Sequence, residues 1–585
     1  MQRHGYRDWD KIFAFCRPYI LSHKKEFKVL FATIFLGTFI SNLIPLIWGK
    51  LIDSLSNINI GKLLLFLLLY AVVTLLLFFM GVFESFLGAK LDYKIEGEIK
   101  QVMLAKALRM SCAELDAFDT GELMSRITSD AGSIIQFVID ALTSIVTIVI
   151  NVITALVFSF EISPHLSAIS LAFVPLSILS NIAFKNKFRE LNERQKQYSD
   201  SLSSFLVNTL NHIFDIKAYR LEENETKQYA NFLDKGWMLH KRNYRLNSFA
   251  SAFSSVASVA SVSVTILISG LLINKGLFTI GKMISFQGYI DKLSTSVNKL
   301  LGMNYSAQTT CVAIDRIQNL LSKSDDFEKS LKINETGIHI REISFEEVFF
   351  QYKEGIPVLE NVSLSIREPG LYAFVGENGC GKTTILKLIM RYYRVVNGQI
   401  KLNDDCINDM STLCVRSSIG YYGKSVYIRN DSLLNNLCLG SSMQIQNNIV
   451  PSNIKEACEI VGLSKFIESL PQRYNTQVGE DGKLLSSGQK QKIAIVRAML
   501  SESSVLLFDE ITSDLDGASE FEIISILRKL SKNRIVIIVS HRINSIAYSN
   551  KIFFMKDGKI SASGAHSELL ESSPAYRSLF KHQKK

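Results

Sequence analysis

The chain has 585 residues, of which 47 % are hydrophobic and 21 % charged, and its formal net charge is +10. The length exceeds one ordinary domain, and the apolar excess disfavours a purely soluble enzyme and favours a membrane protein with a soluble part. The basic charge is better explained by lysines at an anionic membrane face than by nucleic-acid binding, because the chain is rich in apolar residues. A lipid bilayer rather than a nucleic acid is therefore expected as partner. The eight cysteines are scattered without a CxxC pair, which argues against a disulfide framework or a zinc site.

Six long apolar stretches precede residue 310. Each is near or above the roughly 20 residues that a helix needs to cross the hydrocarbon core of a membrane. The second contains LLLFLLLYAVVTLLLFFMGVF, which lacks the polar face of a helix in a soluble bundle. The sequence therefore predicts an all-α transmembrane domain over residues 1–325, with six helices at 27–48, 62–87, 134–160, 164–184, 248–273 and 279–301.

Lysine and arginine indicate the orientation of these helices. They are frequent in the N-terminal arm and in the segments 88–133 and 185–247, whereas FEISPH at 160–165 contains neither. Cytoplasmic segments carry the excess of positive charge, so both termini and both long segments are expected in the cytoplasm. The two segments contain few glycines or prolines, which predicts two helical hairpins that extend out of the membrane.

The sixth stretch carries polar residues at helical spacing. Gln287, Asp291, Ser294 and Asn298 are separated by 4, 3 and 4 positions, which places them on one face of a helix. An ionisable residue at membrane depth usually faces a water-filled cavity or a partner helix, so these four residues are the candidates for the substrate cavity. The alternative is that the span ends earlier and that the four residues lie in the cytosol.

Other polar residues in the predicted spans are less specific. The serines between 251 and 263 are explained by close helix packing through small side chains. For Glu84 and Asp140, a substrate contact and a structural partner are equally compatible with the sequence.

After a polar linker at 326–337, short strand-like runs alternate with helical segments. This pattern predicts an α/β domain with a largely parallel sheet over residues 338–585. The stretch GENGCGKT at 376–383 matches GxxxxGK[ST] between an apolar strand and a helix, which is typical of a loop that binds the phosphates of a nucleoside triphosphate. Lys382 is expected on the β- and γ-phosphates and Thr383 on Mg²⁺. The candidate phosphate-binding residues are Gly376, Asn378, Gly379, Gly381, Lys382, Thr383 and Thr384.

Three further stretches follow in the order LLSSGQKQKIAIVRAML (484–500), SSVLLFDEITSDLD (503–516) and IVIIVSHR (535–542). With the phosphate loop, they make the chain resemble the ATP-binding cassette (ABC) transporter family over essentially its whole length. Six spans followed by one cassette is the layout of an exporter half-transporter in that family. The resemblance implies an ABC-type α/β P-loop ATPase, ATP and Mg²⁺ as cofactors, and ATP hydrolysis coupled to export.

The resemblance also implies roles for single residues. Asp509 would hold Mg²⁺, Glu510 would act as the general base on the attacking water, and His541 would contact the γ-phosphate; Lys382 completes the catalytic set. Tyr352 lies where the family stacks an aromatic on adenine, although an ordinary strand aromatic is the alternative.

In this family each ATP is held between one phosphate loop and the signature loop of a second cassette. The resemblance assigns the signature loop to Ser486, Gly488 and Gln489, and a dimer-contact loop to 513–516. It thus implies a second half-transporter as partner, with a homodimer slightly favoured over a heterodimer. The segments 112–130 and 209–225 resemble the two segments that couple the cassette to the membrane helices.

One position departs from the family. A glutamine that contacts Mg²⁺ is expected after the strand that follows the phosphate loop, but Lys424 aligns there, and Ser487 replaces a usual glycine in the signature loop. Three interpretations stay open: Lys424 pairs with the γ-phosphate, or swings away from the metal, or marks the weakened site of a heterodimer.

The leading functional hypothesis is ATP-driven export of a solute by alternating access. An ATP-gated channel or regulatory subunit is the alternative class, and the retained Glu510 favours turnover over gating. Among substrates, a peptide or an amphipathic small molecule is favoured over a lipid. The expected location is a bacterial plasma membrane.

Overall fold

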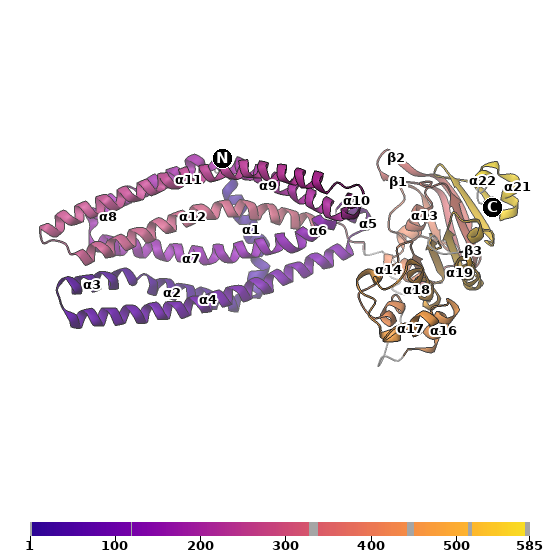
Figure 1. Ribbon diagram of the computed structural model, residues 1–585, viewed down its shortest axis with the longest axis horizontal. Coiled ribbons are helices and arrows are strands. Elements are labelled where there is room, and N and C mark those ends of the chain that lie inside the picture. The colour runs from indigo at the N-terminus through magenta and orange to yellow at the C-terminus, as the bar shows by residue number, and fades with distance from the viewer. Residues whose placement is uncertain (1–2, 119, 327–336, 442–449, 513–516, 580–585) are drawn as a thin grey trace. The chain divides into compact units, whose positions relative to one another are not determined.

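The structure is a computed structural model that describes residues 3–118, 120–326, 337–441, 450–512 and 517–579. The chain divides into two compact units (Figure 1). The first unit comprises Met1–Ala105 and Thr120–Ser322, and the second comprises Lys106–Asp119 and Lys323–Lys585. A short piece from the first half of the chain therefore belongs with the second unit. Most of the predicted linker lies outside the described residues, and the domain boundaries given above stay predictions.

The described part of the first unit is helical. Its long helices include α4, α11 and α12, which run far beyond the length of a membrane span. The helices are α1 (Arg3–Ser22), α2 (Lys24–Ser41), α3 (Ile44–Ser56), α4 (Ile60–Arg109), α6 (Thr120–Ser125), a π-helical turn (Arg126–Asp130), α7 (Ala131–Ile162), α8 (Pro164–Leu171), α9 (Val174–Asn211), α10 (Ile213–Ala218), α11 (Glu222–Asn274) and α12 (Ile280–Leu321).

Proline breaks two of the predicted spans. The stretch predicted as one helix at 27–48 is interrupted between α2 and α3, where Pro45 occupies the first turn of α3. The stretch at 164–184 is interrupted between α8 and α9, where Pro175 occupies the first turn of α9. Proline lacks an N–H and its ring clashes with the preceding turn, so each helix restarts at its proline rather than continuing through it.

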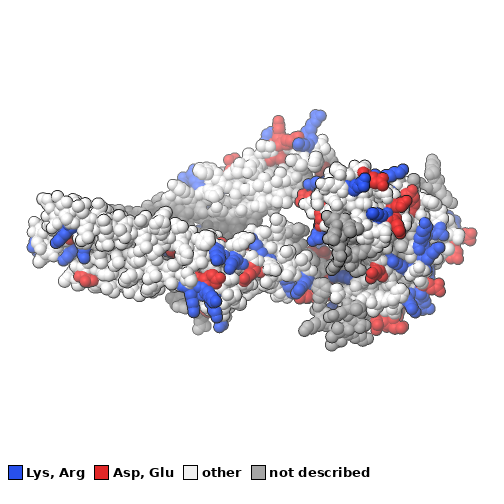
Figure 2. Space-filling model, turned by 90° about the horizontal axis from the view of Figure 1, so that it is seen from below, with Lys and Arg blue, Asp and Glu red and all other residues white. Residues whose placement is uncertain are grey.

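Three helical stretches of the described chain are long and apolar enough to cross a membrane: Lys24–Ser56, Ile60–Arg109 and Gly121–Ile162. A shorter apolar helix occupies Ser258–Asn274. These four coincide with the first, second, third and fifth predicted spans. On the face shown in Figure 2, charged side chains are sparse along the helical unit, and α4 exposes a row of leucine and phenylalanine side chains, as expected for contact with lipid.

The break between α2 and α3 is closed by side chains of α12. Lys292 Nζ donates to the Ser41 carbonyl oxygen at 2.7 Å, and the Tyr289 hydroxyl donates to the Asn42 carbonyl oxygen at 2.8 Å. Asn42 in turn donates to Asn151 of α7 at 3.0 Å. Backbone carbonyls freed by a broken helix cannot bond to water in a bilayer, so these donors stabilise the break and tie α12 and α7 to it.

The second unit contains two sheets, in strand orders β2-β1-β4-β5 and β10-β9-β3-β8-β7-β6. The pairs along β9-β3-β8-β7-β6 are parallel, which confirms the predicted α/β fold class. The strands are β1 (Ile343–Lys353), β2 (Ile356–Ile366), β3 (Gly370–Gly376), β4 (Asn397–Leu402), β5 (Asp405–Cys406), β6 (Ile419–Tyr422), β7 (Val505–Asp509), β8 (Ile535–Val539), β9 (Lys551–Lys556) and β10 (Lys559–Gly564).

Helices pack around the two sheets and beside them (Figure 1). They are α13 (Lys382–Ile389), α14 (Thr412–Ser418), α15 (Leu433–Leu437), α16 (Ser452–Ile460), α17 (Ser464–Ser469), α18 (Ser487–Leu500), α19 (Gly517–Leu530), α20 (Ile543–Ile546), α21 (His566–Ser572) and α22 (Pro574–Leu579); α5 (Cys112–Leu115) is the helix contributed by the segment 106–119. Alternate residues of β3 enter two separate cores: Ala373 packs with α18 and α19, whereas Phe374 packs with α13 and the smaller sheet. A strand buried on both faces is apolar throughout, as LYAFV is.

Close backbone contact between α3 and α12 generates a prediction about stability. A Cβ atom added at Gly281 would collide with the Gly49 carbonyl oxygen and the Asp53 carboxyl carbon. We therefore expect Gly281→Ala to destabilise the transmembrane unit by about 1–3 kcal/mol through overpacking, which thermal unfolding of the purified protein in detergent would measure. Gly270→Ala is the matched control because an added Cβ there meets nothing within 4 Å. Equal unfolding temperatures of the two variants would contradict the packing described.

Candidate functional site

The phosphate loop connects β3 to α13 at the carboxyl edge of the larger sheet. Gly379 and Gly381 have φ angles of 83° and 99°, in the left-handed region that glycine adopts without strain. At Gly376, an added Cβ would collide with the Met555 carbonyl oxygen of the neighbouring strand β9. The glycines of the predicted motif are therefore required by the backbone conformation and by close packing.

Lys382 begins α13 and is only 7 % exposed. Its Nζ donates to the carbonyl oxygens of Gly376 at 2.9 Å and Glu377 at 2.7 Å, so the ammonium group lies over the loop. It also lies 3.8 Å from Cys380 Sγ. Burial raises the pKa of the Cys380 thiol despite the nearby ammonium, which disfavours the reactive thiolate.

Asp509 ends β7 and accepts hydrogen bonds on both carboxylate oxygens. The Thr383 hydroxyl donates to Oδ1 at 3.1 Å, and the Tyr421 hydroxyl donates to Oδ2 at 3.3 Å. Burial raises the pKa of Asp509 and the two hydroxyl donors oppose that rise, while burial and the nearby carboxylate raise the pKa of Tyr421. The structure thus brings the two predicted metal ligands together and adds Tyr421, which sequence reasoning did not identify.

The donor set around Asp509 fits Mg²⁺. Within the described residues no group of three or more His, Cys, Asp or Glu side chains is arranged to hold a metal ion. Mg²⁺ does not need such a group, because it is usually held by one or two carboxylates together with waters and substrate phosphates. The Thr383 hydroxyl and the Asp509 carboxylate are oxygen ligands of that kind, adjacent to the phosphate loop.

Glu510 follows Asp509 in a strained backbone conformation, with a φ of 54°. Its N–H donates to the Val539 carbonyl oxygen of β8 at 3.0 Å. Two basic side chains flank its carboxylate: Lys424 Nζ lies 3.7 Å from Oε2, and His541 Nδ1 lies 3.9 Å from Oε1. The lysine at the unusual position therefore faces the expected general base, an arrangement that none of the three sequence interpretations included.

Tyr352 lies on β1 near the start of α13. Its hydroxyl is 3.2 Å from the Thr384 hydroxyl, and its ring packs edge-on against Phe350 and Tyr393. The side chain is 43 % exposed, which leaves ring surface accessible to a stacking base. Asn378 is exposed on the loop between β3 and α13.

The signature loop does not join this group of residues. The Ser486 side chain accepts from the Gln489 N–H, and the Gln489 side chain accepts from the Ser486 N–H, so the two residues cap α18 reciprocally. Ser486 and Ser487 are exposed and Gly488 is partly so. Across the described chain, no hydrogen bond or ion pair joins Ser486–Gln489 to the phosphate loop; the dimer-contact loop at 513–516 lies outside the described residues.

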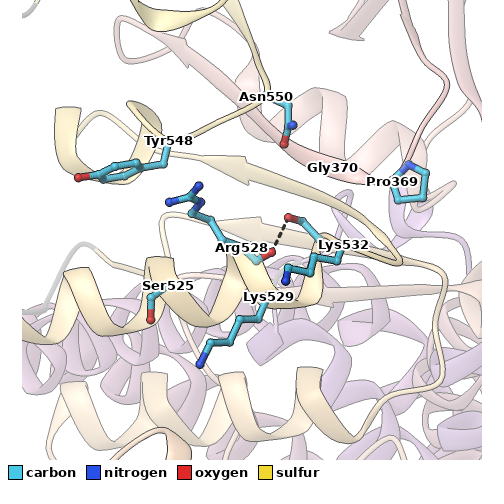
Figure 3. Close-up of a pocket in the computed structure, with 9 residues that line it drawn as sticks. Pro369, Gly370, Ser525, Arg528, Lys529, Lys532, Tyr548 and Asn550 are labelled. Atoms are coloured by element: carbon cyan, nitrogen blue, oxygen red, sulfur yellow. Dashed lines mark hydrogen bonds between the residues drawn. The ribbon is translucent and has the colours of Figure 1, made fainter.

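A separate hollow of about 450 Å³ lies near the opposite end of β3 (Figure 3). Figure 3 shows Arg528, Lys529 and Lys532 of α19 and the segment after it around this space. The remaining lining residues are Pro369, Gly370, Ser525, Ser531, Tyr548 and Asn550. None of the predicted nucleotide-site residues lines it, and basic side chains at the end of a helix are explained by the helix dipole.

Comparison with known proteins agrees with this architecture. The ABC transporter transmembrane region family matches residues 28–297, and the ABC transporter family matches residues 359–513. A candidate multidrug export ATP-binding/permease protein of Staphylococcus aureus is 30 % identical over 468 residues, which cover 79 % of each chain. The chain belongs to the ABC transporter family. It is an exporter-type half-transporter, a multi-pass membrane protein that couples an ATP-binding ABC ATPase domain to transport.

Two further relatives extend the comparison over almost the full length. An ATP-dependent lipid A-core flippase of Syntrophus aciditrophicus is 29 % identical over 566 residues, covering 96 % of this chain and 92 % of the flippase. A bacterial Atm1-family ABC exporter with ATP bound superposes with a TM-score of 0.82 at 20 % identity, covering 96 % of this chain and 98 % of the exporter. The predicted fold, a helical transmembrane region followed by an ABC ATPase domain, is confirmed.

The Tyr421–Asp509 hydrogen bond generates a prediction about ATP turnover. A single hydrogen bond contributes about 1 kcal/mol net, so we expect Tyr421→Phe to lower the rate of ATP hydrolysis by roughly fivefold through a less well oriented Asp509. The measurement is the ATPase rate at saturating Mg-ATP. Tyr422→Phe is the control because Tyr422 is adjacent on β6 but stacks against Phe508 instead. Indistinguishable rates for wild type and Tyr421→Phe would contradict a role for this bond.

Proposed function

We propose that two copies of this half-transporter form a dimer that exports a peptide or an amphipathic small molecule across a bacterial plasma membrane by alternating access. The observation that carries the proposal is the exposed signature loop. Ser486 and Gln489 form hydrogen bonds with each other at the start of α18, and among the described residues no hydrogen bond joins them to the phosphate loop. An exposed helix N-terminus is suited to bind phosphate, so the loop is available to the ATP bound by a second cassette.

In this proposal hydrolysis of ATP relies on positioning the phosphates and the attacking water and on neutralising the charge of the phosphates, as phosphoryl transfer generally does. Lys382 holds the β- and γ-phosphates, and Thr383 and Asp509 hold Mg²⁺. Glu510 orients and deprotonates the attacking water, and His541 contacts the γ-phosphate. The left-handed backbone at Glu510 and its N–H bond to β8 support this role because they fix where the carboxylate points.

The cavity proposal rests on the polar face of α12. Gln287 donates to Asp291 at 2.9 Å, Asp291 and Asn298 are exposed, and Ser294 is partly exposed. Leu293 on another face of the same helix is buried. A polar, ionisable face that is exposed at Asp291 and Asn298 suits a water-filled cavity between two copies. The names of the relatives, a multidrug export protein and a lipid A-core flippase, favour an amphipathic cargo.

One observation supports a second candidate, a heterodimer in which this chain contributes the weaker ATP site. Lys424 stands where the family has glutamine, and its ammonium group lies 3.7 Å from the carboxylate of Glu510. An ion pair with Lys424 would compete with the attacking water for the carboxylate of Glu510. The intact Glu510, His541 and phosphate loop favour an active site, and we therefore place the homodimer first.

The test is Mg-ATPase activity of the chain purified alone in lipid nanodiscs, compared with Glu510→Gln and Lys424→Gln. We expect the wild-type chain to form a dimer that hydrolyses ATP. Glu510→Gln should reduce turnover by at least about 100-fold, which is the usual loss when a general base is removed. Lys424→Gln should raise turnover by roughly two- to fivefold, because a partly exposed ion pair contributes at most about 1 kcal/mol.

The outcomes separate the candidates. A lower rate in Lys424→Gln would mean that the lysine assists turnover, which supports pairing with the γ-phosphate. A chain that is inactive or monomeric in every form would overturn the homodimer and direct the search to a second half-transporter that carries the glutamine.

The polar face of α12 generates a prediction about specificity. If Asp291 faces the cargo, Asp291→Asn should weaken stimulation of the ATPase by cationic amphiphiles by roughly five- to tenfold in half-maximal concentration, while neutral amphiphiles are affected less. The measurement is ATPase stimulation in nanodiscs by a matched series of cationic and neutral detergent-like compounds. Asp140→Asn, which removes a carboxylate from α7, is the comparison. Equal shifts for cationic and neutral compounds would exclude a charge contact at Asp291.

A further inference from the structure

The segment 106–119 connects two membrane helices, yet it belongs with the ATPase unit. Lys106 Nζ lies 2.6 Å from Asp325, and Lys323 Nζ lies 2.8 Å from Glu114. The Asp326 N–H donates to the Arg109 carbonyl oxygen at 2.7 Å. These bonds join the segment to the chain that enters the ATPase domain, and α4 and α6 continue from its two ends. A change in the position of this segment therefore acts directly on two helices of the transmembrane unit.

Tyr393 contacts this segment and the expected adenine site at the same time. Its hydroxyl donates to the carboxylate of Asp116. Its ring stands perpendicular to the ring of Tyr352, with 5.0 Å between centroids, and lies 5.8 Å from the ring of Phe350. Lys387 of α13 lies over both tyrosine rings, at 5.6 Å and 5.8 Å from their centroids. The Tyr393 ring is therefore fixed by aromatic and cation–π contacts on the side that faces Tyr352.

The hydrogen bond between Tyr393 and Asp116 is strong and has a defined direction. Burial and the Asp116 carboxylate raise the pKa of the Tyr393 hydroxyl, so it stays a donor at neutral pH. A phenol that donates to a carboxylate makes a charge-assisted bond whose direction is set by the plane of the ring. Phenylalanine would provide the same aromatic contacts without this bond. The role of the Tyr393 hydroxyl is therefore to bind the segment 106–119 through Asp116.

We propose that Tyr393 is a positioning residue that links occupancy of the adenine site at Tyr352 to the position of the segment 106–119. The proposal rests on the proposed function and on the expected stacking of adenine on Tyr352. A stacked base fixes the Tyr352 ring, the perpendicular contact then restricts Tyr393, and the phenol holds Asp116. This link depends on the base of the nucleotide. The phosphates and the metal are instead the expected ligands of Lys382, Thr383 and Asp509.

The alternative is that Tyr393 only anchors the segment, with or without nucleotide. The two differ in whether the Tyr393–Asp116 bond changes the response to adenine. Amide hydrogen exchange of the full-length Glu510→Gln chain in nanodiscs separates them, because it reports on the phosphate loop and on residues 106–118 in one experiment. The two probes are Mg-ATP and magnesium tripolyphosphate, which carries the phosphate chain without the base, each at a concentration that protects residues 376–383 equally.

With Mg-ATP, we expect exchange in 106–118 to slow by at least about fivefold, a coupling free energy near 1 kcal/mol. Tripolyphosphate should slow it by less than about twofold. Tyr393→Phe should retain ATP protection at 376–383 but lose most of it at 106–118, and Asp116→Ala should do the same. Because the two residues act through one bond, the double variant should add little to either single change.

Tyr392→Phe is the matched control. It changes the adjacent tyrosine, whose ring packs under the Arg416 guanidinium with its centroid at 4.9 Å, and it should leave the ATP response at 106–118 intact. Equal protection of 106–118 by ATP and tripolyphosphate, or an unchanged response in Tyr393→Phe, would overturn the link and leave the proposed ATPase function standing. Failure of Mg-ATP to protect 376–383 would overturn the nucleotide site itself and the link with it.

Discussion

The nucleotide site depends on the parallel register of β3, β8 and β7. Val539 pairs with Phe374 on one side and with Asp509 on the other, so the ends of the three strands lie in one row. The loops that leave this row carry the phosphate loop, Glu510 and His541. The strands are buried on both faces, and a shift of register by one residue would move every side chain into the opposite core. The packing of LYAFV, VLLFD and IVIIV therefore fixes the functional residues before any of them contacts a ligand.

This strand register explains why acidic and basic side chains lie close together in the site. Asp509 and Glu510 are consecutive because one ends the strand and the other begins the turn, where the backbone of Glu510 is left-handed. Each finds a different kind of partner: two hydroxyl groups for Asp509, and the basic side chains of Lys424 and His541 for Glu510. Hydroxyl donors on both oxygens leave the Asp509 carboxylate the kind of oxygen ligand that Mg²⁺ accepts.

The parts predictable from the sequence were those set by local patterns. The phosphate loop, the acidic pair Asp509 and Glu510 after VLLF, and the histidine after IVIIVS each follow an apolar strand, and their meeting at one edge follows from parallel pairing. Tyr421 was not predictable in this way, because its role requires β6 to lie beside β7 and no motif marks that neighbour. The pairing of Lys424 with Glu510 depends on the path of a loop, and the docking of 106–119 on contacts between residues more than 200 positions apart. In the membrane half, the apolar stretches at 27–48, 62–87, 134–160 and 248–273 were predictable from apolar length. The interruptions near Pro45 and Pro175 were not, because each depends on a single proline within a long apolar run.

Tyrosine side chains contact both ends of the expected nucleotide site. Tyr392 and Tyr393 are consecutive after α13, and their rings take different directions. Tyr392 packs edge-on with Tyr421, whose hydroxyl bonds to Asp509 at the metal end. Tyr393 packs edge-on with Tyr352 at the adenine end and bonds to Asp116. The two contacts start from adjacent backbone positions but lead to different places: Tyr392 leads to the Asp509 end, and Tyr393 leads to the Tyr352 end and to the segment that joins two membrane helices.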